Sequence, residues 1–82
     1  MKPDNIRLFI KPFCGWCHEA MAWLDQRGIV YEKLDVTCDR DAYREMVDLT
    51  GQSLAPCLVA DGEVLADFGT DELEEFWERF KV

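Results

Sequence analysis

The sequence predicts a small α/β protein of one domain, in which helices pack on a sheet. The chain has 82 residues, of which 49% are hydrophobic and 32% charged. This composition suits a folded core, and the length is enough for one core but too short for two. Strand-like and helix-like patterns alternate in the order β-α-β-α-β-β-α. No repeat, linker or low-complexity segment interrupts these patterns. We therefore treat residues 1–82 as a single domain.

The first three elements predict a βαβ unit. Residues 6–10 alternate apolar and basic side chains and then become apolar, which is typical of a strand with one half-open face. A helix over residues 14–27 follows, with apolar residues at helical spacing, and Gly28 ends it. Residues 29–36 are rich in β-branched and aromatic side chains and predict a second strand. A crossover helix of this kind joins parallel strands.

The second half of the chain predicts a helix followed by a hairpin. The helix covers residues 39–50, with acidic side chains near its positive N-terminal end. Two strands, 57–60 and 63–66, flank Asp61-Gly62. This dipeptide favours the positive φ angles of a tight hairpin turn.

A last helix closes the chain. It follows Thr70, which we expect to be its N-cap, and acidic Asp71 and Glu72 fall in its first turn. Its apolar side chains recur at helical spacing, at Leu73, Phe76, Trp77 and Phe80.

Composition and charge exclude several classes of function. The net charge of −8 repels phosphate backbones and anionic lipids, so we expect no nucleic-acid or membrane partner. The apolar runs are only a few residues long, and residues 1–5 do not resemble a secretory signal. The four cysteines are too few for a disulfide scaffold. We expect a monomer in the cytoplasm.

The segment Cys14-Gly15-Trp16-Cys17 carries the chemistry. It lies where a strand gives way to a helix, so backbone N–H groups and the helix dipole stabilise a thiolate on Cys14. This pattern predicts that Cys14 attacks a disulfide and that the more shielded Cys17 resolves the mixed disulfide. Lys11 either favours the thiolate and holds a substrate carboxylate or is a solvated loop lysine. Trp16 either packs on neighbouring loops or contacts a docked substrate.

The same two cysteines also fit two other chemistries. A zinc site would take its remaining ligands from Cys38, Cys57 or His18, but zinc ligands usually come in two close pairs and these are isolated. The run Cys-Gly-Trp-Cys-His fits c-type haem attachment, which normally accompanies export and an apolar haem pocket. We expect no metal ligand, and instead place Cys57 in the core, Cys38 in a loop and His18 on the exposed side of its helix.

Three segments taken together are similar to one known family. They are Lys11-Pro12-Phe13-Cys14-Gly15-Trp16-Cys17, Gly51-Gln52-Ser53-Leu54-Ala55-Pro56 and Gly69-Thr70-Asp71-Glu72-Leu73. From Ile6 to Phe80 the chain resembles the glutaredoxins. The resemblance implies a thioredoxin-like three-layer fold, with a four-stranded mixed sheet flanked by three helices and a cis-Pro56 facing Cys14. It also implies an enzyme that reduces protein disulfides and glutathione mixed disulfides, with glutathione as the reductant.

The resemblance also implies which residues hold glutathione. Lys11 and Gln52 would meet its glycine carboxylate, and the backbone of Ala55 would pair with its cysteine unit. The helix start at Thr70 and Asp71 would hold its γ-glutamyl end, because amide groups suit a carboxylate and Asp71 suits an ammonium group. The full set of implied contacts is Lys11, Trp16, Gln52, Ala55, Pro56, Gly69, Thr70 and Asp71.

The chain departs from the usual family pattern at three places. It has Gly15-Trp16 where Pro-Tyr is usual, Ala55 in place of valine before the proline, and Phe68-Gly69 in place of a glycine pair. Phe68 would crowd the glutathione groove, which leaves open a related redoxin that takes electrons from thioredoxin reductase. Gly15 loosens the helix start, which leaves open a carrier of a [2Fe-2S] cluster held between two subunits.

Overall fold

The computed structural model describes residues 5–78 and confirms the predicted order of elements. Phe80, predicted to extend the apolar stripe of the last helix, lies outside these residues. The elements are β1 (Ile6–Ile10), α1 (Gly15–Gln26), β2 (Glu32–Asp35), α2 (Arg40–Thr50), β3 (Cys57–Ala60), β4 (Glu63–Ala66) and α3 (Thr70–Glu78).

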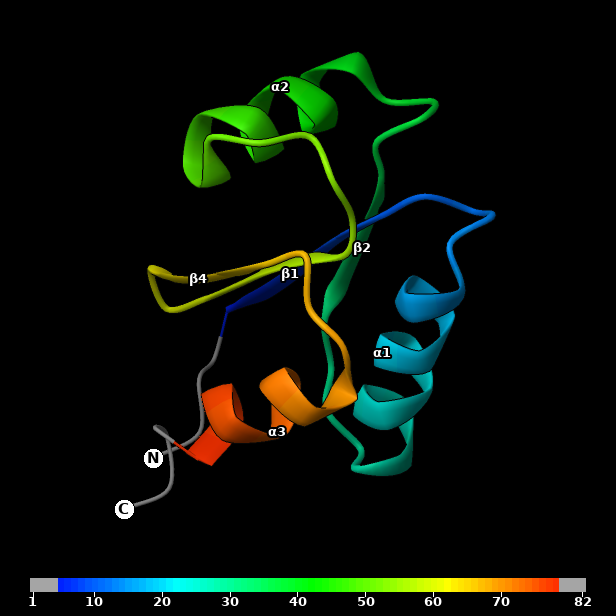
Figure 1. Ribbon diagram of the computed structural model, residues 1–82, viewed down its shortest axis with the longest axis vertical. Helices are drawn as coiled ribbons and strands as arrows, with labels where there is room; N and C mark the ends of the chain where they lie inside the picture. Colours follow the sequence, from blue (N-terminus) through cyan, green and yellow to red (C-terminus); the bar gives the residue numbers. More distant parts are fainter. Residues whose placement is uncertain (1–4, 79–82) are drawn as a thin grey trace.

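The four strands form one mixed sheet in the order β2-β1-β3-β4. β1 and β2 are parallel, as the βαβ unit predicts, while the β1–β3 and β3–β4 pairs are antiparallel. α2 covers one face of this sheet, and α1 and α3 cover the other (Figure 1). The three layers confirm the thioredoxin-like fold that the resemblance implies. Within residues 5–78, no helix combines the length and apolar character needed to span a membrane.

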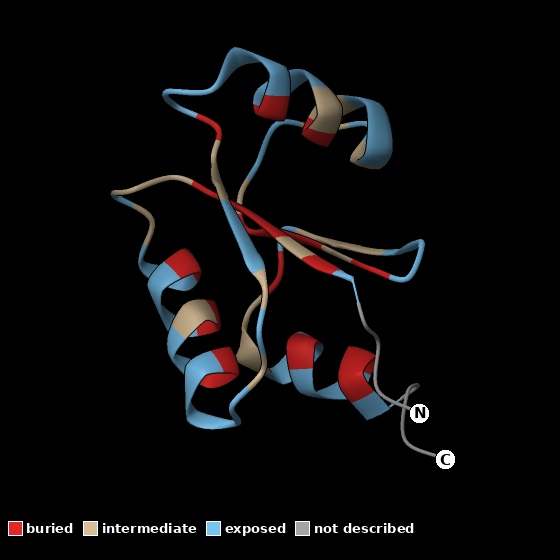
Figure 2. Cartoon of the chain, turned by 180° about the vertical axis from the view of Figure 1, so that it is seen from behind, coloured by how far each residue is buried: buried red, intermediate tan, exposed pale blue. Residues whose placement is uncertain are grey.

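The core is divided by the sheet into two parts. The larger part lies between the sheet and the helices α1 and α3, and it includes Leu8 and Leu24. The smaller part lies under α2 and includes Phe9 and Met46. Neighbouring residues of β1 serve different parts because successive strand side chains point to opposite faces. The buried stretches of all three helices therefore turn toward the sheet (Figure 2).

Most turns and caps form where the sequence predicts them. Asp39 caps α2 by accepting a hydrogen bond from the Ala42 N–H at 3.0 Å. Gly51 ends that helix at φ 73°, a left-handed conformation that favours glycine. Asp61 and Gly62 have φ values of 51° and 85°, as a tight hairpin between β3 and β4 requires. The hairpin prediction is confirmed.

The predicted starts of the second strand and of the last helix are wrong. The second strand begins at Glu32 and not at residue 29, because the Ile29 N–H donates to the Leu24 carbonyl at 3.0 Å and belongs to the end of α1. Thr70 is the first residue of α3 and not its N-cap. The Gly69 carbonyl accepts the Leu73 N–H at 3.1 Å, so Gly69 takes the cap position.

An ion-pair cluster joins α2 to the sheet. The guanidinium of Arg7 on β1 donates two hydrogen bonds of 2.6 Å to Glu45 on α2 and one of 3.2 Å to Glu32 on β2. It also lies 5.4 Å from the centre of the Phe9 ring. The hydrogen bonds with Glu45 raise the pKa of Arg7, and the same bonds lower the pKa of Glu45. Both groups therefore stay charged and paired at neutral pH.

Candidate active site

Cys14 occupies the N-cap of α1. Its backbone is extended, with φ −105° and ψ 112°, and its Sγ accepts a hydrogen bond of 3.2 Å from the Cys17 N–H. Its carbonyl accepts the His18 N–H at 3.2 Å and so begins the helical ladder. A backbone N–H donated to sulfur at a helix start stabilises the negative charge of a thiolate. Because Cys14 is only half-buried, a substrate can reach this sulfur.

Cys17 lies one turn further along α1 and is fully buried in the larger part of the core. Burial raises the pKa of its thiol, and a hydrogen bond with Cys14 adds to the shift. Cys17 therefore carries its proton at neutral pH. The pair thus combines an accessible sulfur at a helix start with a protonated, shielded sulfur behind it.

The loop before β3 lies directly against Cys14. The Ala55–Pro56 peptide bond is cis, as the resemblance implies. The Cys14 thiol donates to the Ala55 carbonyl oxygen at 3.7 Å, and the Lys11 Nζ donates to the Ser53 carbonyl oxygen at 3.1 Å. These two contacts place residues 53–55 beside residues 11–14.

Gln52 is bonded within its own loop. Its amide oxygen accepts the Leu54 N–H, and its Nε2 donates to the Leu54 carbonyl at 3.1 Å and to the Cys57 Sγ at 3.2 Å. The Cys57 thiol in turn donates to the Leu54 carbonyl at 3.0 Å. Cys57 is fully buried, as predicted for a core residue, and burial raises its pKa. Gln52 and Cys57 together hold the loop that reaches Cys14.

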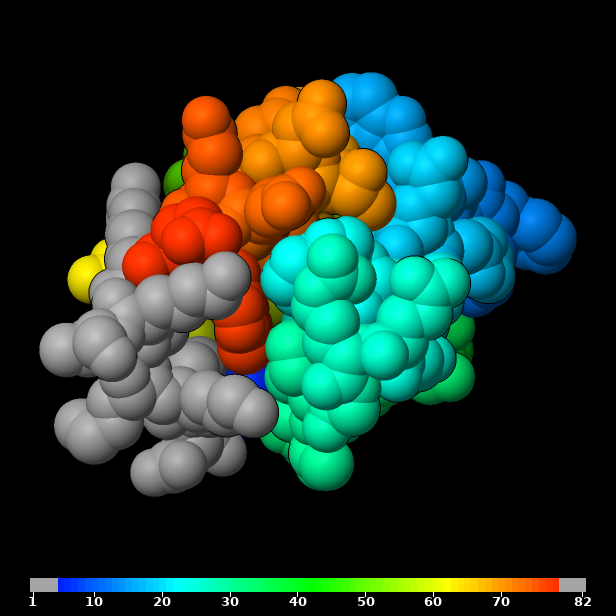
Figure 3. All heavy atoms as spheres, turned by 90° about the horizontal axis from the view of Figure 1, so that it is seen from below, coloured from blue at the N-terminus to red at the C-terminus, as the bar shows by residue number. Residues whose placement is uncertain are grey.

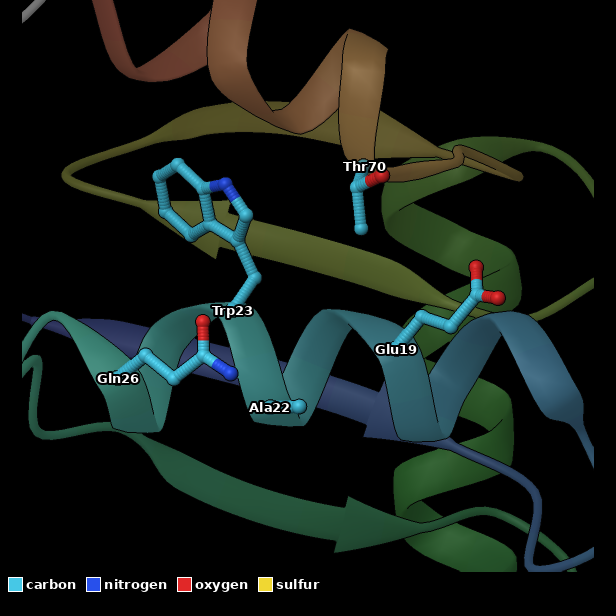
Figure 4. A pocket seen from close by; sticks show the side chains of 5 residues that line it. All are labelled: Glu19, Ala22, Trp23, Gln26 and Thr70. Carbon is cyan, nitrogen blue, oxygen red and sulfur yellow. The ribbon is translucent and has the colours of Figure 1, made fainter.

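α3 begins next to the same loop. The Asp67 N–H, just before α3, donates to the Pro56 carbonyl at 2.8 Å. A groove of about 320 Å³ runs between α1 and α3, and Thr70 points from the start of α3 toward α1 across it (Figure 4). Asp71 is exposed, while Phe68 is 1% exposed and belongs to the core. The expectation that Phe68 crowds the groove is therefore wrong, because its ring packs inward.

Sequence reasoning missed the α1 side of this groove. Its lining residues share one helix face because they follow the spacing i, i+3, i+4 and i+7. The sequence contains this spacing, but the apolar stripe of α1 predicts only the side of the helix that faces the core. The residues are Glu19, Ala22, Trp23 and Gln26.

The remaining sequence candidates lie apart from one another. His18 is exposed, as predicted, and its Nε2 lies 2.7 Å from the Pro12 carbonyl oxygen. Cys38 is exposed in the turn before α2. Among residues 5–78, no three His, Cys, Asp or Glu side chains gather as metal ligands would. All four cysteine thiols are free.

Comparisons with known proteins agree with this geometry. A glutaredoxin-like 8.6 kDa protein of Clostridium pasteurianum is 27% identical over 74 residues, which cover 90% of this chain and 99% of that protein. Glutaredoxin 3 of Escherichia coli is 26% identical over 69 residues, covering 84% of this chain and 81% of that protein. The solved structure of the thioredoxin-like protein BC3987 is 28% identical with a TM-score of 0.80, covering 87% of this chain and 97% of that one. The profile of the glutaredoxin family matches residues 6–65, well over half of the sequence, and the chain therefore belongs to the glutaredoxin family.

Proposed function

We propose that this protein reduces protein disulfides and glutathione mixed disulfides, with Cys14 as the nucleophile, Cys17 as the resolving thiol and glutathione as the reductant. The observation that carries the proposal is the position of the Cys14 Sγ. It caps α1, accepts the Cys17 N–H at 3.2 Å and lies 3.7 Å from the Ala55 carbonyl. Membership of the glutaredoxin family supports thiol oxidoreductase activity in general.

The two sulfurs act in a fixed order. The Cys14 thiolate attacks one sulfur of the substrate disulfide, and the other sulfur leaves as a thiolate and takes up a proton. Cys17 then loses its proton and attacks the Cys14 sulfur, which releases the second substrate thiol and leaves a Cys14–Cys17 disulfide. Because burial keeps Cys17 protonated, it does not compete for the first attack. Two molecules of glutathione then restore the two thiols and become one oxidised glutathione.

Three features of the site support glutathione as that reductant. Lys11 places a cation beside the 53–55 segment, where it suits a carboxylate. The Ala55 backbone borders the Cys14 sulfur. The start of α3 presents Thr70 and Asp71 at its positive end, which suits a second carboxylate and an ammonium group.

The test compares two electron sources. Reduction of a protein disulfide is followed with glutathione and glutathione reductase, and in parallel with thioredoxin reductase, using Cys14→Ser as the inactive control. We expect turnover with glutathione only. Turnover with thioredoxin reductase alone would contradict glutathione dependence and keep the disulfide chemistry, whereas no turnover with either would contradict the proposed function.

The [2Fe-2S] carrier role is tested separately. It stays a prediction from Gly15, and it is measured by anaerobic reconstitution in excess glutathione followed by visible spectroscopy. A colourless monomer would contradict it.

A further inference from the structure

Three large apolar side chains are exposed around Cys14. Phe13 is fully exposed at 101%, Trp16 is 52% exposed and Leu54 is 54% exposed. Phe13 and Trp16 flank Cys14 in the chain. Leu54 lies between two residues whose carbonyls accept hydrogen bonds from the active-site segment. The Ser53 carbonyl accepts one from the Lys11 Nζ, and the Ala55 carbonyl accepts one from the Cys14 thiol. We name this group the apolar rim: Phe13, Trp16 and Leu54.

Burial does not explain the exposed part of the apolar rim. An apolar side chain stabilises the folded state only when it leaves water, and a fully exposed ring such as Phe13 gains nothing there. Apolar side chains exposed together beside a reactive sulfur are typical of a surface that receives a partner. The surface reaches from the segment before α1 to the loop before β3.

One side of the apolar rim is acidic. The Asp67 N–H bonds to Pro56 and places this carboxylate residue beside the loop that holds Leu54. Asp71 follows in the first turn of α3, and the Glu72 carboxylate folds back to 3.4 Å from where a Cβ on Gly69 would lie. Glu19 faces the same helix start across the groove of Figure 4. We name these residues the acidic border: Glu19, Asp67, Asp71 and Glu72.

The charge continues along α3. Every exposed residue of this helix, as far as the structure describes it, is acidic, and its apolar residues face the core. α1 and α3 lie side by side on this face of the molecule (Figure 3). The exposed residues of α3 are Asp71, Glu72, Glu74, Glu75 and Glu78. A substrate that approaches Cys14 past α3 therefore meets a negative potential.

Lys11 does not cancel this charge. It is a single cation, and its Nζ donates to the Ser53 carbonyl beside Leu54. It supplies a local contact for one carboxylate, whereas the acidic border and α3 carry most of the charge on this face. Lys11 thus favours a carboxylate of the substrate, whereas the negative charge of the acidic border and α3 favours its cationic residues.

From the apolar rim and the charge beside it, we propose that the protein partner of this site is a cationic segment with an apolar side chain next to its disulfide cysteine. The apolar side chain packs on the rim, and the lysines or arginines of the partner face the acidic border. This inference rests on the proposed function, because the partner is the disulfide that Cys14 attacks. In that reaction the partner disulfide becomes two thiols while Cys14 and Cys17 become a disulfide, so the reduced protein needs no other reductant.

The experiment uses the pre-reduced full chain in a single turnover. Three cyclic peptides carry the same disulfide: one has lysines and a leucine beside a cysteine, one has glutamates and the leucine, and one has lysines and a serine. A small uncharged disulfide serves as the reference. Rates are followed by acid quenching and chromatographic separation of the peptide dithiol.

Charge selection should depend on salt. We expect the lysine peptide to react about tenfold faster than the glutamate peptide at about 20 mM salt, and this ratio to shrink strongly at about 500 mM. The lysine peptide with leucine should react faster than the one with serine at either concentration. Equal rates for the lysine and glutamate peptides at low salt would overturn the proposal.

Matched variants locate the effect. Glu72→Lys should lower the lysine-to-glutamate ratio, whereas Asp48→Lys, with the same charge change on α2 across the sheet, should leave it unchanged. Leu54→Ser should remove the advantage of leucine over serine, whereas Leu49→Ser, at a similarly exposed leucine of α2, should not. Equal effects within either pair would overturn the proposal. Failure to reduce even the uncharged disulfide would instead contradict the proposed function.

Discussion

The Sγ of Cys14 lies 3.7 Å from the carbonyl oxygen of Ala55, although the two residues are 41 positions apart in the chain. The first residue caps α1 and the second precedes the cis-Pro56 bond, so the sulfur lies between a helix start and the loop before β3. A disulfide that binds along this backbone meets Cys14 before it can meet the buried Cys17. The exposure of Cys14 and the burial of Cys17 therefore support the proposed order of attack.

We expect Cys17→Ser to stop the reaction at a covalent intermediate. Without the Cys17 thiol, nothing in the pair can displace the substrate from Cys14. Mass spectrometry of the variant with a protein disulfide should show one substrate attached through Cys14, while turnover of glutathione mixed disulfides continues. Cys14→Ser should show no adduct. An adduct on Cys17 in the Cys14→Ser variant would reverse the assigned roles.

We expect the stability of the reduced protein to fall at alkaline pH. Unfolded cysteines ionise near a pKa of about 8.5, whereas burial raises the pKa of both Cys17 and Cys57 in the folded protein. Above that pH the folded state binds more protons than the unfolded state, so the stabilisation, complete below the unfolded pKa, is lost as the pH rises toward the folded pKa. Each unit of pKa difference corresponds to about 1.4 kcal/mol.

Urea unfolding of the reduced protein between pH 7 and pH 10 measures this effect. Cys57→Ala should be less stable at every pH because it leaves a cavity, yet its stability should fall less steeply with pH. A slope equal to that of the unaltered chain would contradict the explanation.

We expect Gln52→Leu to loosen the loop next to Cys14. The variant removes the amide that bonds to Leu54 and Cys57, so the free energy of unfolding should fall by about 1–3 kcal/mol. Ser53→Ala is the control, because the hydrogen bond from the Lys11 Nζ goes to the Ser53 backbone carbonyl and not to its side chain. A higher KM for glutathione with unchanged stability would show that Gln52 binds the ligand and does not brace the loop.

We expect Glu45→Gln to weaken the packing of α2 on the sheet. The loss should be up to about 1 kcal/mol at neutral pH, since the Glu45 side chain is 41% exposed and water screens the pair. Arg7 lowers the pKa of Glu45, so the contribution is present above the unfolded pKa of about 4.3 and is lost as pH falls through the folded value. The difference in stability between the variant and the unaltered chain should therefore shrink as the pH falls below about 4.3 in urea unfolding.

Glu32→Gln is the matched control for this pair. Glu32 makes one longer bond to Arg7 and is 62% exposed, so its loss should be smaller. An equal loss in the two variants would contradict the assignment of Glu45 as the main partner of Arg7.

Much of the fold could be predicted because its signals are local. Asp39 caps α2, Gly51 ends it, and Asp61-Gly62 forms the hairpin turn, each through φ angles or bonds that span four residues or fewer. The predicted N-cap of α3 is wrong by one residue. Thr70 suits an N-cap by residue type, but the Gly69 carbonyl accepts the first hydrogen bond of the helix. Residue preferences alone do not choose between adjacent positions.

The sequence by itself determined the order of the elements and the position of Cys14 at a helix start, because helix, strand and turn preferences act between near neighbours. Only the tertiary structure decided that Ala55 borders Cys14, that Phe68 packs inward and that Gln52 bonds to Cys57. Those outcomes depend on the register of β3 against β1 and on where α3 packs on the sheet. Both are set by the burial of apolar surface between distant parts of the chain.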